Sequence, residues 1–499
     1  MAAKAGTGKG IILLLSCAAQ FMVVLDIAIV NVALPSIQKD LGIGQSTLQW
    51  IVIAYGLMLG GFLLLGGRMA DLLGRRRILL TGLVLFSSAS LLAGLAGSAG
   101  LLIGARALQG FGAALLPPAA LSILAVTFEE GADRNRALGI YGAVAGLSAS
   151  VGVIASGLLT DGPGWRWVFL INVPVGVLLI AAAAIFLPVD DRDGRSSRGF
   201  DVAGAVTVTG GLLLLVYAVN RASNVGWGSG STLGLFAASV VMLSAFVRIE
   251  ARTRSPLVPG SSVRNRTLVA ANLSAFFIFG AFFAFLFLGS LFMQQVLGYS
   301  PTRTGICWLA TSATSFFAAA ITGTKLVAVM GVRRLLVAGL SLLAISALLL
   351  TRVPPGANFA ADLLPALVLA GVAGGLSAPS AQIGALSGVA NSLAGLASGL
   401  VETTREIGGA IGVAAVSTVL ISRAGEIAGA ADPAARGLAA ANAFHAAFWV
   451  IFVVAALGAL TAAIAFPRRI TQELELGPAP SDVSVVPPDV VLEPLEEMW

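Results

Sequence analysis

The chain has 499 residues, of which 57% are hydrophobic and only 11% are charged. Soluble domains carry roughly 25% charged residues, so this composition excludes an ordinary soluble protein and favours one polytopic membrane unit. The sequence has 1 His and 2 Cys, which leaves no metal-binding or nucleophilic constellation. We therefore expect no enzyme, no metal and no cofactor.

Long apolar segments without alternating polarity follow one another along the chain. Because backbone that faces lipid must satisfy its hydrogen bonds internally, such segments predict membrane-spanning helices. The predicted fold class is an all-α polytopic membrane protein with fourteen spans. The spans lie at residues 11–34, 48–67, 78–97, 100–121, 137–159, 167–187, 202–220, 231–249, 267–289, 304–324, 333–351, 363–383, 398–421 and 445–466.

The distribution of basic residues predicts the orientation in the membrane. With the amino terminus inside, 21 of the 30 Lys and Arg residues fall on the cytoplasmic side and 7 fall outside. Cytoplasmic loops are generally enriched in Lys and Arg, so both termini are predicted to be cytoplasmic. The same bias accounts for the net charge of +6, and we expect no nucleic acid as a partner.

Changes in composition divide the chain into five predicted regions. The tail has six prolines and seven acidic residues without a helical period, which predicts a disordered cytoplasmic segment. The polar run at 190–198 predicts a cytoplasmic linker at the edge of the first bundle. The regions are a cytoplasmic amino terminus (1–10), an amino-terminal six-helix bundle (11–187), a linker with two inserted spans (188–266), a carboxy-terminal six-helix bundle (267–466) and the tail (467–499).

A single acid, Asp26, lies deep inside the first predicted span. A charged side chain there costs roughly 2.5–3.5 kcal/mol on insertion scales, so such residues usually mark transport routes. Counting residues from the outer ends of their spans places Asp26 at a depth of about 12 Å and Arg106 at about 9 Å. The two charges can therefore share one layer. We interpret them as a proton-coupling pair, and the alternative is a static ion pair that joins two helices.

Two loops repeat the same residues at an offset of 257 positions. The loops at 66–77 and 323–334 share Gly66 with Gly323, Gly74 with Gly331, Arg76 with Arg333, and Arg77 with Arg334. Internal repeats of this kind are common in transporters. If the second span corresponds to the tenth, spans one to six match spans nine to fourteen, and the seventh and eighth are an insert. Asp71 of the first loop is replaced by Ala328 in the second.

A second charged group lies in the thirteenth predicted span. Glu402, Arg405 and Glu406 are three and four residues apart, so they share one helix face. They form either a structural salt-bridge set or a second site for a proton or a cationic substrate. Aromatic rings in the ninth span could hold flat apolar compounds, although several must face lipid or neighbouring helices. The candidate substrate-binding residues are Asn31, Gln109, Asn272, Phe276, Phe279 and Phe283.

These motifs resemble the major facilitator superfamily, in particular its fourteen-spanner drug:proton antiporters. The loop at 67–77 matches the motif most diagnostic of the superfamily, and the runs at 25–35, 106–110, 165–174 and 297–301 follow the same group in order. The resemblance covers nearly the whole chain outside the tail. It implies two six-helix bundles with two extra helices between them, and a monomer driven by the proton gradient.

The resemblance also implies roles for individual residues. Arg106 lies in a run similar to the proton-coupling motif of that group, and the first-helix motif contains Asp26. Asp71, Gly74, Arg75 and Arg76 correspond to a cytoplasmic gate, in which Asp71 docks on the positive amino end of the thirteenth helix. The alternative for this loop is a charge cluster that only maintains orientation.

The chain departs from the family pattern in two helices. In the fifth span, Val153 and Ser156 replace a proline and a glycine of the motif that usually separates exporters from importers. In the thirteenth span, Glu402 and Glu406 replace the Asn and Gln that are common in the family. The first departure keeps an importer open as an alternative.

We therefore expect proton-coupled efflux of small hydrophobic drugs or antibiotics across the cytoplasmic membrane of a bacterium. The expected partners are protons, lipid and a small molecule that is apolar or cationic. The first alternative is a proton-coupled importer of a small metabolite. A membrane receptor or membrane-embedded enzyme is disfavoured, because the sequence has no sizeable soluble domain and no catalytic cluster.

Overall fold

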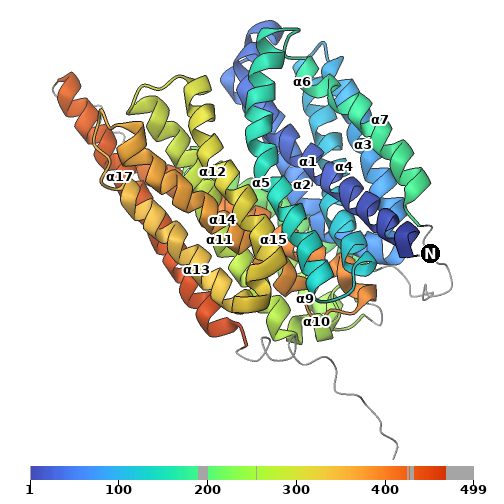
Figure 1. The fold of residues 1–499 in the computed structure, drawn as a ribbon. Coiled ribbons are helices and arrows are strands. Elements are labelled where there is room, and N and C mark those ends of the chain that lie inside the picture. The colour runs from blue at the N-terminus through green and yellow to red at the C-terminus, as the bar shows by residue number, and fades with distance from the viewer. Residues whose placement is uncertain (1, 189–200, 254–255, 424–425, 427–431, 468–499) are drawn as a thin grey trace, which may run out of the picture.

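The computed structural model describes residues 2–188, 201–253, 256–423, 426 and 432–467, and within them it contains helices and no strand. The linker predicted at 190–198 and the tail from residue 468 onward lie outside the described residues. Figure 1 shows two bundles side by side, one built from the first part of the chain and one from the last part. The predicted all-α class is confirmed.

The amino-terminal bundle contains one helix more than predicted, because its last span is divided into a short α6 and a longer α7. α1 continues past Pro35 and extends beyond the predicted span at both ends. The helices are α1 (Ala2–Leu41), α2 (Gln45–Leu73), α3 (Arg75–Gly94), α4 (Ala99–Thr127), α5 (Ala132–Asp161), α6 (Trp167–Leu170) and α7 (Asn172–Phe186).

The last turn of α1 is held by the segment between α5 and α6. Asp40 accepts hydrogen bonds from the indole nitrogen of Trp165 at 3.0 Å and from Arg166 at 2.7 Å. These two bonds hold the pKa of the exposed Asp40 carboxyl below its usual value. The contact fixes one end of the bundle outside the apolar part of α1.

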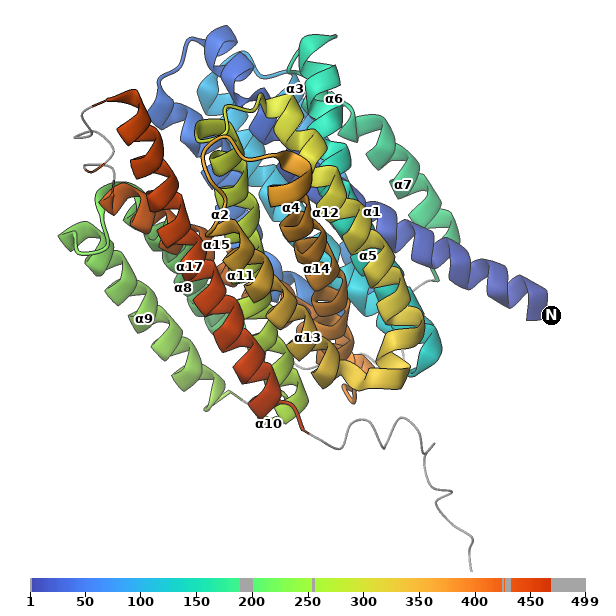
Figure 2. The ribbon, with the colours of Figure 1, turned by 60° about the vertical axis from the view of Figure 1, so that its left-hand side comes forward.

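The inserted helices pack on one side of the two bundles. They are α8 (Val202–Val225), α9 (Gly230–Glu250) and the short α10 (Gly260–Arg264). α8 contacts α2 of the first bundle, α15 of the second and α9. Figure 2 shows α9 at the outer edge of the molecule, and its apolar side chains Val240, Val241 and Val247 are exposed. In a membrane this surface faces lipid.

The carboxy-terminal bundle has the same general arrangement, with a π-helical turn before two of its helices. Asn265 and Ser300 accept hydrogen bonds from the first turns of α11 and α12, which satisfies donors that a helix start leaves open. The elements are α11 (Arg266–Gln295), α12 (Pro301–Ile321), η1 (Thr322–Leu326), α13 (Val327–Leu350), η2 (Phe359–Leu363), α14 (Leu364–Leu386), η3 (Asn391–Leu393), α15 (Ala394–Ser422) and α17 (Pro433–Ala465).

Twelve segments of the described chain are long and apolar enough to cross a membrane. One of them, Thr302–Leu350, is 49 residues long and contains two of the predicted spans. Within it, Gly331 has a non-helical backbone. The predicted span at 137–159 lies inside α5, which is not among the twelve. The chain is therefore a multi-pass membrane protein, while the number fourteen and the orientation of the termini stay predictions.

The two predicted repeat loops have the same backbone and the same contact. Gly74 lies between α2 and α3 with φ of 108°, and Gly331 has φ of 72° at the corresponding position in α13. Both values favour glycine. Arg76 donates to the backbone carbonyl of Ala184 at the end of α7. Arg333 donates to the carbonyl of Ala463 at the end of α17. In each bundle, the repeated arginine thus binds the carboxyl end of the bundle's last helix.

The most extensive contacts between the two bundles are made by two helix pairs. α2 packs against α15, and α5 packs against α12. Glycines make the approach close: a Cβ on Gly67 would meet the backbone of Gly395 and Gly399, and one on Gly139 would meet the backbone of Gly323. Small residues allow such backbone contact between membrane helices. These contacts lie at the end of the molecule that is predicted to be cytoplasmic.

Candidate functional site

Asp26 lies in the interior of the amino-terminal bundle and accepts hydrogen bonds from three side chains. Its Oδ2 is 2.5 Å from Nη1 of Arg106 on α4. Its Oδ1 accepts from Nε2 of Gln109 at 2.8 Å and from Nδ2 of Asn172 at 3.0 Å. Asp26 is 0% exposed and Arg106 is 1% exposed. The pair is therefore a buried, charge-assisted contact in which the carboxylate is well satisfied.

Four helices supply this network. α1 carries Asp26, α4 carries Arg106 and Gln109, α7 begins with Asn172, and α3 supplies Ser90, whose hydroxyl accepts from Gln109 at 2.6 Å and from Asn172 at 3.3 Å. α4 can supply two members because it packs against α1, α2 and α3. Sequence reasoning did not select Ser90 or Asn172. The only signal was that Asn172 falls in the run at 165–174.

Arg106 also connects the network to α2. Its Nε donates to the carbonyl of Ile51 at 3.2 Å, and its guanidinium carbon lies 4.0 Å from the centre of the Tyr55 ring. A guanidinium over an aromatic face gains about 0.5–2 kcal/mol. Arg106 therefore joins Asp26 of α1 to two residues of α2.

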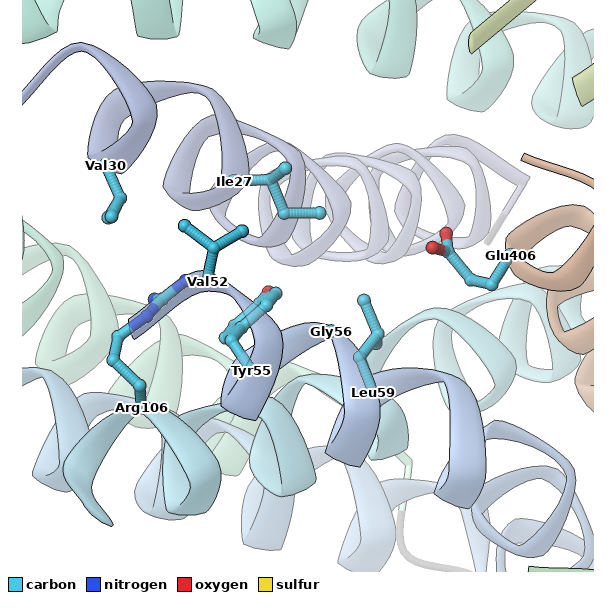
Figure 3. A pocket seen from close by; sticks show the side chains of 8 residues that line it. All are labelled: Ile27, Val30, Val52, Tyr55, Gly56, Leu59, Arg106 and Glu406. Carbon is cyan, nitrogen blue, oxygen red and sulfur yellow. The ribbon is translucent and has the colours of Figure 1, made fainter. Parts of the chain in front are cut away.

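A cavity of about 100 Å³ lies beside this network. Figure 3 shows Arg106 at one side, Glu406 at the other and Tyr55 between them. The rest of the wall is apolar and includes Ile27 and Val30 of α1. Asp26 itself does not line the cavity, so Arg106 and Tyr55 separate the acid from the space that a substrate could enter.

The second charged group predicted from the sequence comes together on α15. Nη1 of Arg405 lies 2.6 Å from Oε2 of Glu402, and its Nη2 lies 3.0 Å from Oε1 of Glu406. The two acids differ in burial: the side chain of Glu402 is 1% exposed, whereas that of Glu406 is 19% exposed. Only Glu406 lines the cavity.

The residues predicted as a gate join the two bundles. The Oδ1 of Asp71 accepts from the backbone N–H of Gly395 at 2.9 Å, and its Oδ2 accepts from that of Leu396 at 2.8 Å. Both donors are in the first turn of α15, where the helix dipole favours an anion. Arg75 donates to Asp71 at 3.4 Å and also to the carbonyl of Asn391. This geometry can hold one end of the molecule closed.

The predicted substrate-binding residues are placed in different environments. The side chain of Asn31 lies outside the described residues, and Gln109 belongs to the Asp26 network. Asn272 accepts a hydrogen bond from Thr404 at 3.0 Å, which joins α11 to α15. Phe279 packs against Arg405 at 5.4 Å. The two remaining phenylalanines make edge-to-face contacts, Phe276 with Phe277 and Phe283 with Phe279.

The altered motif of the fifth span faces α1 of its own bundle. The hydroxyl of Ser156 donates to the backbone carbonyl of Ile29 at 2.5 Å. A Cβ on Gly152 would meet Ala28 and the backbone of Leu25. α5 is continuous through this region. The side chain of Val153 lies outside the described residues.

Sequence comparisons relate the chain to a known family and to named resistance and export proteins. The model of the Major Facilitator Superfamily matches residues 16–413. Over 361 residues the chain is 40% identical to the puromycin resistance protein pur8 of Streptomyces alboniger, a match that covers 71% of this chain and 70% of that protein. Over 295 residues it is 40% identical to the cephamycin export protein CmcT of Amycolatopsis lactamdurans, which covers 59% of this chain and 61% of that protein. The match to the second protein thus spans less than two thirds of its length.

A third relative and two solved structures extend these matches. Over 398 residues the chain is 31% identical to the lincomycin resistance protein of Streptomyces lincolnensis, covering 74% of this chain and 81% of that protein. The human organic anion transporter MFSD10 has a TM-score of 0.62 at 16% identity, covering 90% of this chain and 99% of that chain. The proton:xylose symporter XylE has a TM-score of 0.61 at 15% identity, covering 91% and 95%. At these identities the structural likeness shows the fold alone.

Proposed function

Since this chain belongs to the Major Facilitator Superfamily, we propose that it is a proton-coupled antiporter that expels small hydrophobic drugs or antibiotics across the cytoplasmic membrane. The names of its relatives support the cargo, because they include resistance or export proteins for puromycin, cephamycin and lincomycin. Alternating access between the two bundles would move the compound, and the proton gradient would supply the energy.

The observation that carries the proposal is the contact between Asp26 and Arg106 at 2.5 Å. A proton on Asp26 would remove the negative charge that holds Arg106. Arg106 would keep the carbonyl of Ile51 and Oε1 of Gln109 as acceptors, so its charge would not be left without a partner. Because Arg106 also lies against Tyr55, protonation would change the wall of the cavity. This links proton uptake to the substrate space.

The closed end of the molecule supports one stage of the cycle. Asp71 docks on α15, and Glu130 of the first bundle accepts from the N–H of Gly388 in the second at 2.9 Å. With the predicted orientation, this end is cytoplasmic. The conformation is then the one in which a bound compound can no longer return to the cytoplasm. A proton from outside would then reach Asp26 and favour opening of this end.

Import is the second candidate function, and the fifth span carries the argument for it. Val153 and Ser156 depart from the motif that is associated, by resemblance, with antiporters. The fold does not decide the direction, because the similar solved structures include a proton:xylose symporter. We favour export because the residues of the first span, the gate loop and α4 follow the exporter pattern.

Everted membrane vesicles test both the coupling and the direction. An exporter in vesicles that are acidified inside should accumulate a drug in the lumen and dissipate the proton gradient when the drug is added. Puromycin is a suitable first compound, and vesicles without the protein are the control. Gradient-driven loss of substrate from the lumen would instead establish an importer and overturn the proposal of export.

A further inference from the structure

The wall of the cavity is different on its two sides. The part contributed by α1 and α2 is apolar apart from the hydroxyl of Tyr55, and Arg106 reaches one side. The opposite side is formed by Glu406 of α15. A compound in this space therefore touches side chains from both bundles, and among the described residues of the wall the one carboxylate comes from the second bundle.

One oxygen of Glu406 is available to a ligand. Arg405 donates to Oε1 through Nε at 3.2 Å and through Nη2 at 3.0 Å. Within the described residues, no hydrogen bond reaches the second oxygen, Oε2. Glu402 is different, because it is buried and lies 2.6 Å from the same guanidinium, away from the cavity. The two acids therefore have different surroundings although they lie on one helix face.

A second observation also points to a ligand. Tyr55 is 3% exposed, and its hydroxyl is buried without a hydrogen-bond partner in the described part of the chain. Buried hydroxyl groups are usually hydrogen-bonded. Figure 3 shows this hydroxyl on the cavity side of α2, with Glu406 across the space. A polar group of a bound molecule would satisfy it.

The balance of charge decides which polar group fits. Glu402, Arg405 and Glu406 together place two carboxyl groups on one guanidinium, and of these two acids Glu406 is the one on the cavity wall. The charge of Arg106 is matched by Asp26, and the Tyr55 ring covers its face. The cavity therefore attracts a cation more strongly than an anion.

We infer that Glu406 and the Tyr55 hydroxyl form a cation-binding subsite for the protonated amine of a substrate with an apolar body. This inference rests on the proposed transport function and specifies its substrate class. An ammonium group would donate to Oε2 of Glu406 and to the hydroxyl oxygen of Tyr55, while the apolar body would contact α1 and α2. Drug-sized ligands usually occupy about 300–1,000 Å³, so in this conformation the cavity takes only the amine-bearing end.

Three probes with the same body and different charge test this subsite. They are 4-phenylbutylamine, its uncharged N-acetyl amide, and 4-phenylbutyrate. Dissociation constants are measured by calorimetry on the purified full-length protein at neutral pH. We expect the amine to bind at least about tenfold more tightly than the amide, equal to about 1.4 kcal/mol, and the carboxylate to bind most weakly.

Variants of Glu406 then test whether this residue causes the preference for the amine over the amide. Glu406→Gln should bring the ratio of amide to amine dissociation constants to about one, while Arg405 keeps Glu402 as its partner. Glu406→Asp should retain part of the preference. The matched control is Glu426→Gln, which changes an acid whose side chain is 66% exposed and should leave the ratio as in the wild type.

Several outcomes would overturn the subsite. These are a wild-type ratio near one, a ratio that survives in Glu406→Gln, and tighter binding of 4-phenylbutyrate than of the amine. Equal weakening of all three probes by Glu406→Gln would show that Glu406 only shapes the cavity. Proton movement driven by a drug is measured separately on the wild type, so a failed subsite with intact coupling removes only this inference.

Discussion

Asp26 is a buried acid whose hydrogen-bond partners are already in place. Arg106, Gln109 and Asn172 all donate to its carboxylate. A proton that arrives on Asp26 must therefore displace a charge-assisted hydrogen bond, which is stronger than a neutral one. In the proposed mechanism, the strength of coupling therefore depends on how well the remaining acceptors on α2 and α4 accommodate Arg106.

We expect Asp26→Asn to abolish drug-dependent proton movement, because an amide cannot take up and release a proton. The protein is reconstituted into vesicles with an internal pH-sensitive dye, and the signal should fall to that of protein-free vesicles. Glu426→Gln, an exposed acid-to-amide change, should behave as the wild type. Wild-type proton movement by Asp26→Asn would remove the coupling role from this residue.

The contact between Asp26 and Arg106 should also appear as an energetic coupling. Removing one partner of a buried ion pair costs about 3–5 kcal/mol, so Asp26→Asn and Arg106→Gln should each lower the free energy of unfolding. The double variant should be more stable than the two separate losses imply, by up to about 3 kcal/mol. Denaturant unfolding in detergent measures this, and additive losses would contradict direct coupling.

The sequence alone could predict that Asp26 and Arg106 lie at a similar depth in the membrane, because depth along a helix follows from counting residues. It could not find Ser90 or Asn172, since the choice of partner depends on how α3 and α7 are rotated about their axes. Period and composition leave that rotation open in helices that are apolar on all sides. The roles assigned to the site residues stay predictions.

The proposed gate depends on a contact between the end of one helix and the start of another. Asp71 lies in the last turn of α2 and binds the first turn of α15. The sequence could suggest this docking only through the family resemblance, because α15 begins more than 300 positions further along the chain. The repeated loop of the second bundle has Ala328 at the corresponding position, so only one bundle supplies the carboxylate.

Asp71→Asn should shift the molecule toward the conformation that is open at this end. The loss of a charge at a helix amino terminus is worth about 1 kcal/mol, which corresponds to about a fivefold change in population. Ser398→Cys, at a buried position near the gate, reports the change through its labelling rate by an impermeant maleimide, after Cys17 and Cys307 are replaced by Ser. Asp133→Asn is the exposed control. An unchanged labelling rate would argue against the gate.

Ser156, which departs from the family pattern, makes a hydrogen bond between two helices of its own bundle. Its hydroxyl joins α5 to α1 through the carbonyl of Ile29, so we expect Ser156→Ala to lower the free energy of unfolding by about 1 kcal/mol. Ser88→Ala is the control, because the exposed hydroxyl of Ser88 donates to the carbonyl of Val84 within α3. Equal stability of the two variants would show that the link to α1 contributes nothing.

The two bundles approach each other through glycine backbones. Added side-chain volume between the bundles should therefore change the population of the closed conformation. Gly139→Ala places a Cβ against the backbone of Gly323, and overpacking of this kind costs about 1–3 kcal/mol. We expect the closed conformation to be populated roughly 5- to 150-fold less. Labelling of Ser398→Cys should accelerate accordingly. Gly104→Ala, where an added Cβ would meet no atom of a neighbouring helix within 4 Å in the described part of the chain, should have no such effect.

The architecture was easier to predict than the boundaries of its parts. Long apolar segments indicated helices in membranes, and the two loops at an offset of 257 indicated related bundles. Arg76 and Arg333 each donate a hydrogen bond to a backbone carbonyl at the end of their bundle's last helix. The division of one span into α6 and α7, and the extension of α1 beyond its apolar part, had no clear signal in composition.

The position of α8 makes the two seams of the transporter unlike each other. α8 contacts both α2 and α15, so a helix shields that seam from the surrounding lipid. The seam between α5 and α12 is formed by the two bundles themselves. A hydrophobic compound dissolved in one leaflet of the bilayer therefore meets two different flanks. On the flank of α8 a further helix lies between the lipid and the seam, whereas on the opposite flank only the packing of α5 against α12 separates the lipid from the interior.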